Sequence, residues 1–174
     1  MMHATPGYTN LLNNTQLSTT LFEKEARFMV DVLTEIIIGA PVERTAAYAA
    51  NPVHAPEWYV NIDSAEWARG DQVEIGAQAA FRARFLGKEL SYVYEIAAYE
   101  PGKLLVMQTA DGPFPMETTY AWESAGERAT RMTLRNRGTP RGFSALVSPL
   151  MAFMMRRANN NDLRLLKKLL ESRG

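Results

Sequence analysis

The 174-residue sequence contains no cysteine and only two histidines, His3 and His54. The absence of cysteine excludes a disulfide scaffold, a thiolate metal site and a cysteine nucleophile. Two histidines are too few for a multi-histidine metal site. We therefore expect neither a metal nor a cofactor.

Long hydrophobic runs are also missing. The longest, from Ile36 to Val42, is far shorter than the ~20 apolar residues that span a bilayer. Residues 1–28 carry charged side chains and no sustained apolar stretch, unlike a secretory signal. The sequence predicts a cytoplasmic protein with no integral membrane segment.

The formal net charge is zero, but the two signs are unevenly distributed. Residues up to Glu127 include 8 Lys or Arg and 17 Asp or Glu, whereas the rest of the chain has 11 and 2. The late basic residues alternate with apolar ones, which favours mutual neutralisation within one fold over a nucleic-acid-binding tail. No aromatic residue follows Phe153 to stack on bases. We expect no nucleic-acid partner.

The length and the 47% apolar content fit one domain with a hydrophobic core. The first 15 or so residues are rich in Asn, Thr, Gly and Pro, and a short helix is predicted over residues 15–28. We therefore divide the chain into a partly flexible N-terminal extension, residues 1–28, and a single domain, residues 29–174.

Local patterns predict the order of the elements. β-branched residues favour a first strand over residues 28–38, and Pro41 can begin a short helix that Asn51 and Pro52 end near Ala50. A second short helix is predicted over residues 54–58, and the chain then becomes extended over residues 59–62. Alternating apolar and polar residues predict antiparallel strands over residues 77–85, 90–96, 104–109, 116–123 and 130–137.

From Phe143 to the C-terminus, apolar residues recur at three- and four-residue spacing. This period predicts one amphipathic helix of about thirty residues. Pro149 lies near its start, so we expect a kink or a break between residues 142 and 150.

The element order predicts an α+β fold in which a curved antiparallel sheet of about seven strands wraps around the long C-terminal helix. Two short helices follow the first strand. A curled sheet that grips a helix tends to leave a cavity between them. We expect the protein's chemistry in that cavity.

Several motifs support this fold by family resemblance. The segments from Ile36 to Glu43, from Asn51 to Trp58 and from Tyr99 to Leu105, together with the terminal helix, resemble the START-like helix-grip superfamily (SRPBCC), polyketide cyclase/dehydrase and lipid-transport type. The resemblance implies the fold above and a range of activities: aromatase/cyclases, lipid and quinone carriers, hormone receptors and co-chaperone activators. Two departures are Asn51, where the family usually has Asp, and the small pair Thr45 and Ala46.

Methionine and aromatic residues gather on the faces predicted to enclose the cavity. Flexible thioethers suit apolar ligands of varied shape but also fill irregular cores, and an inward phenol requires a hydrogen-bond partner, which a ligand or a backbone group can supply. Trp58 is expected to plug one end of the barrel within reach of a ligand. The predicted ligand-binding residues are Trp58, Phe81, Tyr92, Tyr94, Met107, Met116, Thr118, Tyr120, Trp122, Met132, Asn136, Met151, Met154 and Met155.

A titratable catalytic group is not evident. Glu95, Glu117, Arg82 and Arg84 alternate onto the outer face, where cross-strand ion pairs are their expected role, and His54 is a lone histidine near the second short helix. We therefore name no catalytic residue and leave open whether the protein is an enzyme.

The main hypothesis is a monomeric or homodimeric protein that binds a hydrophobic or polycyclic small molecule, such as a lipid, a quinone or a polyketide-like compound. An alternative is a polyketide aromatase/cyclase, in which Tyr92, Tyr94, Tyr120 or Asn136 polarises carbonyls during aldol cyclisation and dehydration. Another is a protein-interaction or co-chaperone-like module.

Overall fold

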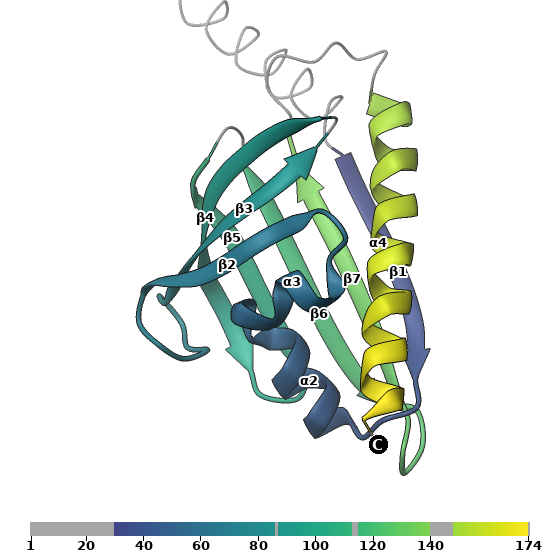
Figure 1. Ribbon diagram of the computed structural model, residues 1–174. Helices are drawn as coiled ribbons and strands as arrows, with labels where there is room; N and C mark the ends of the chain where they lie inside the picture. The colour runs from purple at the N-terminus through teal and green to yellow at the C-terminus, as the bar shows by residue number, and fades with distance from the viewer. Residues whose placement is uncertain (1–29, 86, 113–114, 140–147, 174) are drawn as a thin grey trace, which may run out of the picture.

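The computed structural model describes residues 30–85, 87–112, 115–139 and 148–173 (Figure 1). The predicted N-terminal extension and its short helix lie outside these residues. The elements are β1 (Val30–Ile38), α2 (Val42–Ala50), a 3₁₀ turn (Pro52–His54), α3 (Ala55–Trp58), β2 (Ile62–Arg69), β3 (Gln78–Phe85), β4 (Lys88–Glu100), β5 (Leu104–Asp111), β6 (Met116–Ser124), β7 (Thr130–Gly138) and α4 (Ser148–Ser172).

The seven strands of the described residues form one antiparallel sheet in the order β1-β7-β6-β5-β4-β3-β2. Strands β2 to β7 follow one another as a meander, and β1 pairs with β7 at the other edge, with Ile36 opposite Met132. The predicted strands are present, and the extended chain that begins near Ile62 is the edge strand β2.

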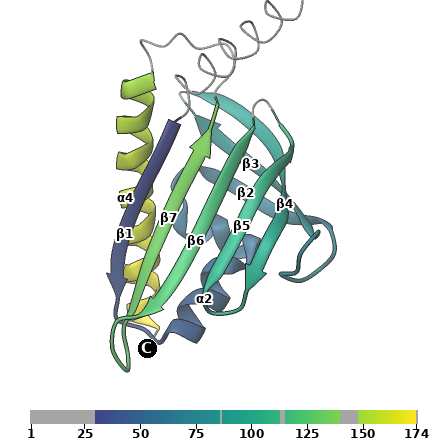
Figure 2. The same ribbon diagram turned by 180° about the vertical axis from the view of Figure 1, so that it is seen from behind.

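The described helices lie on the concave side of the curled sheet. In Figure 1, α4 runs beside β1 while α2 and α3 cover the lower end, and in Figure 2 the convex side of the sheet faces the viewer with none of these helices in front of it. The end of α4 is tied to the β1–α2 connection, since Glu171 accepts a 2.7 Å hydrogen bond from the Gly39 amide. Arg44 also donates to the Leu170 carbonyl, at 3.1 Å. The α+β helix-grip prediction is confirmed.

The expected kink or break between residues 142 and 150 falls mostly on residues outside the described ranges. As described, α4 runs from Ser148 to Ser172, has 25 residues and carries Pro149 as its second residue. The part of the predicted helix before Ser148 lies outside the described residues.

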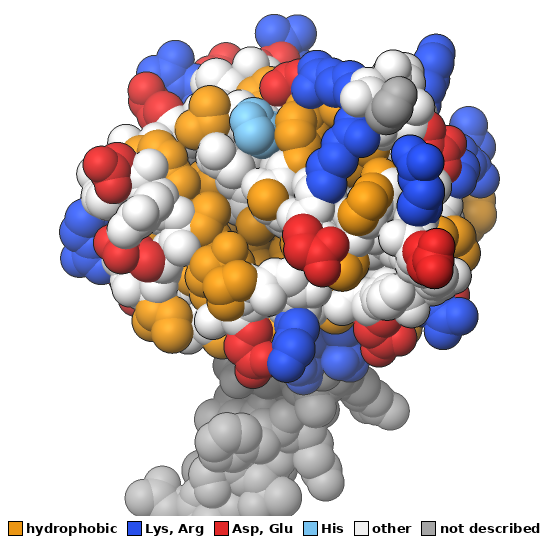
Figure 3. All heavy atoms as spheres, turned by 90° about the horizontal axis from the view of Figure 1, so that it is seen from below, with side chains coloured by type: hydrophobic (Ala, Val, Ile, Leu, Met, Phe, Trp, Pro, Cys, Tyr) orange, Lys and Arg blue, Asp and Glu red, His pale blue; other side chains and the backbone are white. Residues whose placement is uncertain are grey.

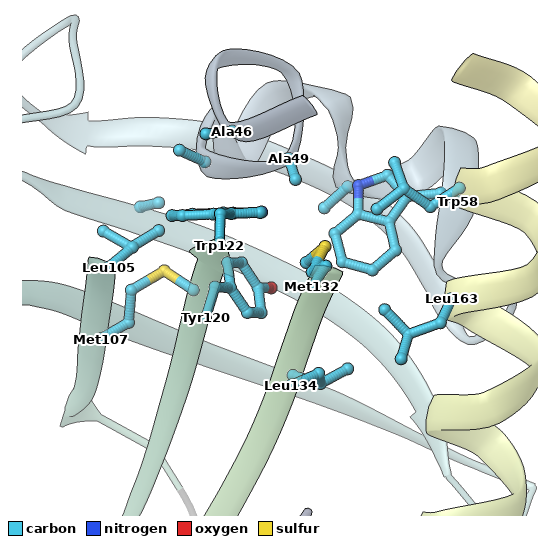
Figure 4. Close-up of a cluster of buried hydrophobic side chains, with 14 of the residues drawn as sticks. Ala46, Ala49, Trp58, Leu105, Met107, Tyr120, Trp122, Met132, Leu134 and Leu163 are labelled. Atoms are coloured by element: carbon cyan, nitrogen blue, oxygen red, sulfur yellow. The ribbon is translucent and has the colours of Figure 1, made fainter. Parts of the chain in front are cut away.

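The hydrophobic core occupies the lower half of the space between the sheet and the helices. Trp122 of β6 lies beneath Ala46 and Ala49 of α2, and Trp58 faces Leu163 of α4 (Figure 4). From the end where α2 and the C-terminus lie, hydrophobic side chains occupy much of the middle of the face, among charged side chains of both signs (Figure 3). The small side chains of α2 let this helix approach the sheet closely.

Ion pairs on the outer face join the acidic and basic parts of the chain. Arg135 of β7 donates two hydrogen bonds to Asp31 of β1, at 2.8 and 2.6 Å, and Arg137 lies 3.7 Å from Glu117 of β6. The Arg135 guanidinium holds the pKa of the Asp31 carboxyl below its usual value. Away from the outer face, Arg173, directly after α4, pairs with Glu57 of α3 at 2.9 Å. The expected neutralisation within one fold is therefore present.

Substitution of a single leucine in α4 should test how strongly the helix is held. Leu166 is fully buried, and Leu165 beside it is 41% exposed. We expect Leu166→Ala to lower the free energy of unfolding by about 2–5 kcal/mol, because it removes buried methyl groups and leaves a cavity. The control Leu165→Ala should change it by less than about 0.5 kcal/mol. Urea unfolding measures both values, and equal losses would contradict this packing.

Candidate functional site

A cavity of about 200 Å³ lies between the concave face of the sheet and α4. Strands β3 to β7 supply one wall and α4 supplies the opposite wall. Tyr59 and Asn61 contribute from the segment after α3, and Ile62 from the start of β2. The cavity adjoins the core, so that core and cavity share the same layer. Its lining is mainly apolar and aromatic, with a few polar groups.

Ten of the residues predicted to bind a ligand line this cavity. They come from five strands and one helix, which only the folded sheet brings together. Their role in binding remains a prediction. They are Phe81, Tyr92, Tyr94, Met107, Met116, Thr118, Tyr120, Asn136, Met151 and Met155.

The other four predicted residues do not line the cavity. Trp58, Trp122 and Met132 point inward as expected but lie in the core, where α2, α3 and the lower part of α4 cover the sheet (Figure 4). Met154 is half-buried on α4 and does not reach the cavity, although its neighbour Met155 does. Alternation predicts which face a side chain takes but not its height along the strand, so core and cavity residues look alike in the sequence.

Aromatic rings form the wall of the cavity on β3 and β4. Phe81 stacks on Tyr92 with ring centroids 5.3 Å apart, and Tyr92 lies 5.1 Å from Tyr94. Burial raises the pKa of both phenols above their ordinary value. They therefore stay protonated at neutral pH, where each hydroxyl can donate or accept a hydrogen bond.

A pair of phenols joins the sheet to the segment after α3. The hydroxyl oxygens of Tyr59 and Tyr120 are 2.6 Å apart, and burial raises the pKa of both groups. One hydroxyl must donate to the other, so one proton of the pair remains available. Tyr59 was not among the predicted residues because it follows α3 in a segment without alternation.

A chain of hydrogen bonds crosses from the sheet to α4 along the cavity. Thr118 Oγ1 donates to Asn136 Oδ1 at 2.7 Å, and Asn136 Nδ2 donates to Asn159 Oδ1 at 3.1 Å. All three residues are buried and line the cavity. The chain ends at Asn159 Nδ2, which is buried and has no acceptor among the described residues. Such an unpaired buried donor is uncommon in folded proteins.

Asp162 brings a carboxylate into the cavity lining. Its side chain lies on the inner face of α4, with 3% of the residue's surface exposed, and its Oδ1 accepts a 3.0 Å hydrogen bond from the Val60 amide. Burial raises the pKa of this carboxyl to about 6, against the lowering effect of the Val60 hydrogen bond. The cavity therefore contains a group that titrates near neutral pH, as general acids and bases do.

Asn159 and Asp162 could have been found from the sequence. A search for hydrophobic positions alone does not select them. On α4, the inner face runs through Met151 and Met155 to Leu163 and Leu166. Asn159 and Asp162 fall on that face at helical spacing. They are therefore polar residues at positions where the helical repeat predicts apolar ones. Polar residues on the inner face of an amphipathic helix indicate a site more directly than the methionines around them.

The titratable residues considered as catalytic candidates from the sequence lie outside the cavity or at its edge. Glu95 pairs with Arg69 at 3.1 Å and Arg84 pairs with Asp63 at 3.0 Å, while Arg82 is exposed. Glu117 faces Arg137, and the His54 ring stacks on Tyr48 and lies 3.0 Å from the Tyr48 carbonyl oxygen. The expected outer-face pairing is present for Glu95, Glu117 and Arg84, although Arg84 also reaches the cavity lining.

Two further observations concern the described residues alone. They contain no group of three or more His, Asp or Glu side chains placed to hold a metal ion. None of their helices is both long and apolar enough to span a membrane.

The raised pKa of Asp162 predicts a pH dependence of stability. The folded protein holds this proton more tightly than the unfolded chain, whose Asp has a pKa of 3.8, so this group lowers the free energy of unfolding as the pH rises from about 4 to 6. The full effect is of the order of 3 kcal/mol. Asp162→Asn keeps an acceptor for Val60 and should stabilise the protein at pH 8 but scarcely at pH 4.

Urea unfolding of the wild type and the variant at both pH values measures this difference. Glu66→Gln, which makes the same chemical change at an exposed position of β2, serves as the control. An equal effect of Asp162→Asn at pH 4 and pH 8 would contradict the assignment.

Comparisons with known proteins agree with this architecture. The family model described as polyketide cyclase / dehydrase and lipid transport matches residues 29–171. No curated protein matches the sequence. Similar solved structures include TTHA0849 from Thermus thermophilus, with 20% identity and a TM-score of 0.72 over 83% of this chain and 99% of that one.

Two more solved structures share this fold. The Zhui aromatase/cyclase from Streptomyces sp. R1128 has 12% identity and a TM-score of 0.70, over 83% of this chain and 95% of that one. A START superfamily protein from Mycobacterium smegmatis has 14% identity and a TM-score of 0.63, over 82% and 95%. At these identities the likeness shows a shared fold. With the family match across nearly all of the described residues, the chain belongs to the polyketide cyclase/dehydrase and lipid-transport family.

Proposed function

We propose that this protein binds a hydrophobic small molecule, of lipid, quinone or polyketide-like character, in the cavity between the sheet and α4. The observation that carries the proposal is the cavity itself, which is lined by aromatic and methionine side chains and contains a small set of buried polar groups. Apolar walls with a few oriented polar groups are typical of small-molecule sites. Family and fold support the same class of function.

The size of the cavity bears on the kind of ligand. Its volume of about 200 Å³ is below the ~300–1,000 Å³ of pockets that enclose drug-sized molecules. Met107, Met116, Met151 and Met155 line it, and flexible thioethers can move to accept a larger shape. We therefore propose a ligand with one or a few rings or a short chain.

A cavity-filling substitution tests this proposal. Ala158 of α4 lines the cavity, so Ala158→Phe should place a ring inside it and weaken binding of the neutral probe 1-naphthalenemethanol at least tenfold. Arg157→Phe adds the same ring at the adjacent exposed position and should leave the affinity unchanged. Isothermal titration calorimetry measures the affinity of the wild type and both variants for this probe. Failure of the wild type to bind, or unaltered binding by Ala158→Phe, would overturn the proposal.

A second candidate function is the cyclase-type reaction, and Asp162 favours it. An aldol closure needs a base that removes a proton beside a carbonyl and donors that stabilise the resulting oxyanion. The Asp162 carboxylate, with its pKa near 6, could take that proton, while the Tyr59–Tyr120 pair could donate to the oxygen. The same groups would bind a ligand without turnover, so turnover has to be measured.

Incubation with a short poly-β-keto thioester distinguishes the two. A cyclase should yield the cyclised and dehydrated product, seen by mass spectrometry as loss of water, faster than buffer does. Asp162→Asn should then slow it by about 10²–10⁴, the usual contribution of a general base. A wild-type rate equal to that of buffer would exclude this candidate and leave the binding proposal intact.

A further inference from the structure

The Asp162 carboxylate is buried without a positive partner. Among the described residues no Lys, Arg or His forms an ion pair with it, and its one hydrogen bond from these residues comes from the Val60 amide. Arg84 is the basic residue of the cavity lining, but it is largely exposed and pairs with Asp63. A buried carboxylate with one neutral donor is costly, because desolvation is compensated only in part.

The groups around Asp162 suit a cation better than an anion. Tyr59 and Tyr120 lie close enough to interact electrostatically with its carboxylate, and Tyr92 adds a third ring to the same lining. All three phenols are neutral at physiological pH, and their ring faces attract positive charge. An anionic ligand would be repelled by the carboxylate and would find no buried cation among the described residues of the lining.

A second, independent observation points to the rest of the ligand. Asn159 lies one turn before Asp162, and its Nδ2 is buried without an acceptor among the described residues, at the end of the Thr118–Asn136–Asn159 chain. Residues three apart on a helix are neighbours, with Cβ atoms roughly 5–6 Å apart. The helix therefore presents an unpaired donor and an unpaired negative group side by side to one cavity.

We propose that the cavity selects apolar or aromatic amines, with the protonated amine on Asp162 and an acceptor oxygen or a ring face of the ligand next to Asn159 Nδ2. This inference rests on the proposed binding function and names the class of its ligand. The ammonium group of the ligand supplies the positive charge that the described residues do not, and the aromatic wall of β3 and β4 packs against the ligand's apolar body.

Three probes of one shape but different charge test the selection. They are 1-naphthylmethylamine, which is a cation, 1-naphthalenemethanol, which is neutral, and 1-naphthoic acid, which is an anion at pH 7.5. By calorimetry we expect the amine to bind about ten to a hundred times more tightly than the alcohol, as a charge-assisted hydrogen bond allows. The acid should bind most weakly.

The pH provides a second readout. Asp162 accepts from the Val60 amide and interacts electrostatically with Tyr59 and Tyr120, while Tyr92 lines the same cavity. None of these phenols titrates between pH 5 and 7.5, and the Arg84–Asp63 pair lies at the edge. Burial raises the pKa of Asp162 to about 6. The amine's affinity should therefore fall between pH 7.5 and pH 5, while that of the alcohol stays constant.

Two variants test whether the preference for the amine depends on Asp162. Asp162→Asn should abolish the preference for the amine over the alcohol, whereas the exposed control Glu66→Gln should leave that preference unchanged. If the alcohol binds but the amine binds no more tightly, or if Asp162→Asn retains the amine preference, the amine inference is wrong and the binding proposal stands. If the wild type binds none of the three probes, the binding proposal fails, and the amine inference fails with it.

Discussion

The packing of α4 against the concave face of the sheet is the interaction on which the rest of this structure depends. The helix presents one face to two different environments. Its C-terminal part buries Leu163, Leu166 and Leu170 in the core, whereas its N-terminal part presents Met151, Met155, Asn159 and Asp162 to the cavity. Because hydrophobic burial in the lower half holds the helix in place, the upper half can carry polar groups that contribute little to packing and still keep their positions.

Charge is treated differently on the two sides of the sheet. On the convex face, Asp31 forms an ion pair with Arg135, and Glu117 forms one with Arg137. These pairs are exposed to water, so they cost little to form and contribute modestly to stability. On the concave side, Asp162 of α4 lies among phenols, and the Val60 amide is its one hydrogen-bond donor among the described residues. The outer pairs neutralise the uneven charge of the sequence, while the inner carboxylate remains available to something that enters the cavity.

Hydrogen bonds hold several polar side chains of the cavity in defined positions. The Thr118–Asn136–Asn159 chain fixes three side chains by two hydrogen bonds, and the Tyr59–Tyr120 pair fixes two more. A buried network of this kind holds its atoms in defined positions before a ligand arrives, which is the condition for selective binding and for catalysis alike. Binding and turnover would use the same walls, and the difference lies in whether Asp162 only attracts charge or also takes a proton.

The sequence by itself determined the strands, the order of the elements, the inward faces and the family, because alternation, helical period and the Pro-containing motifs act over a few neighbouring residues. It identified ten residues that line the cavity, such as Tyr94 and Met107, along with Trp58, Trp122 and Met132, which lie in the core without reaching the cavity. Only the tertiary structure separated these two sets, since the height at which α2 and α3 cover the sheet is set by contacts between distant segments. It alone also paired Tyr59 with Tyr120, 61 residues apart, and buried Asp162 with no cation beside it among the described residues, because burial and partnership are properties of the packed chain.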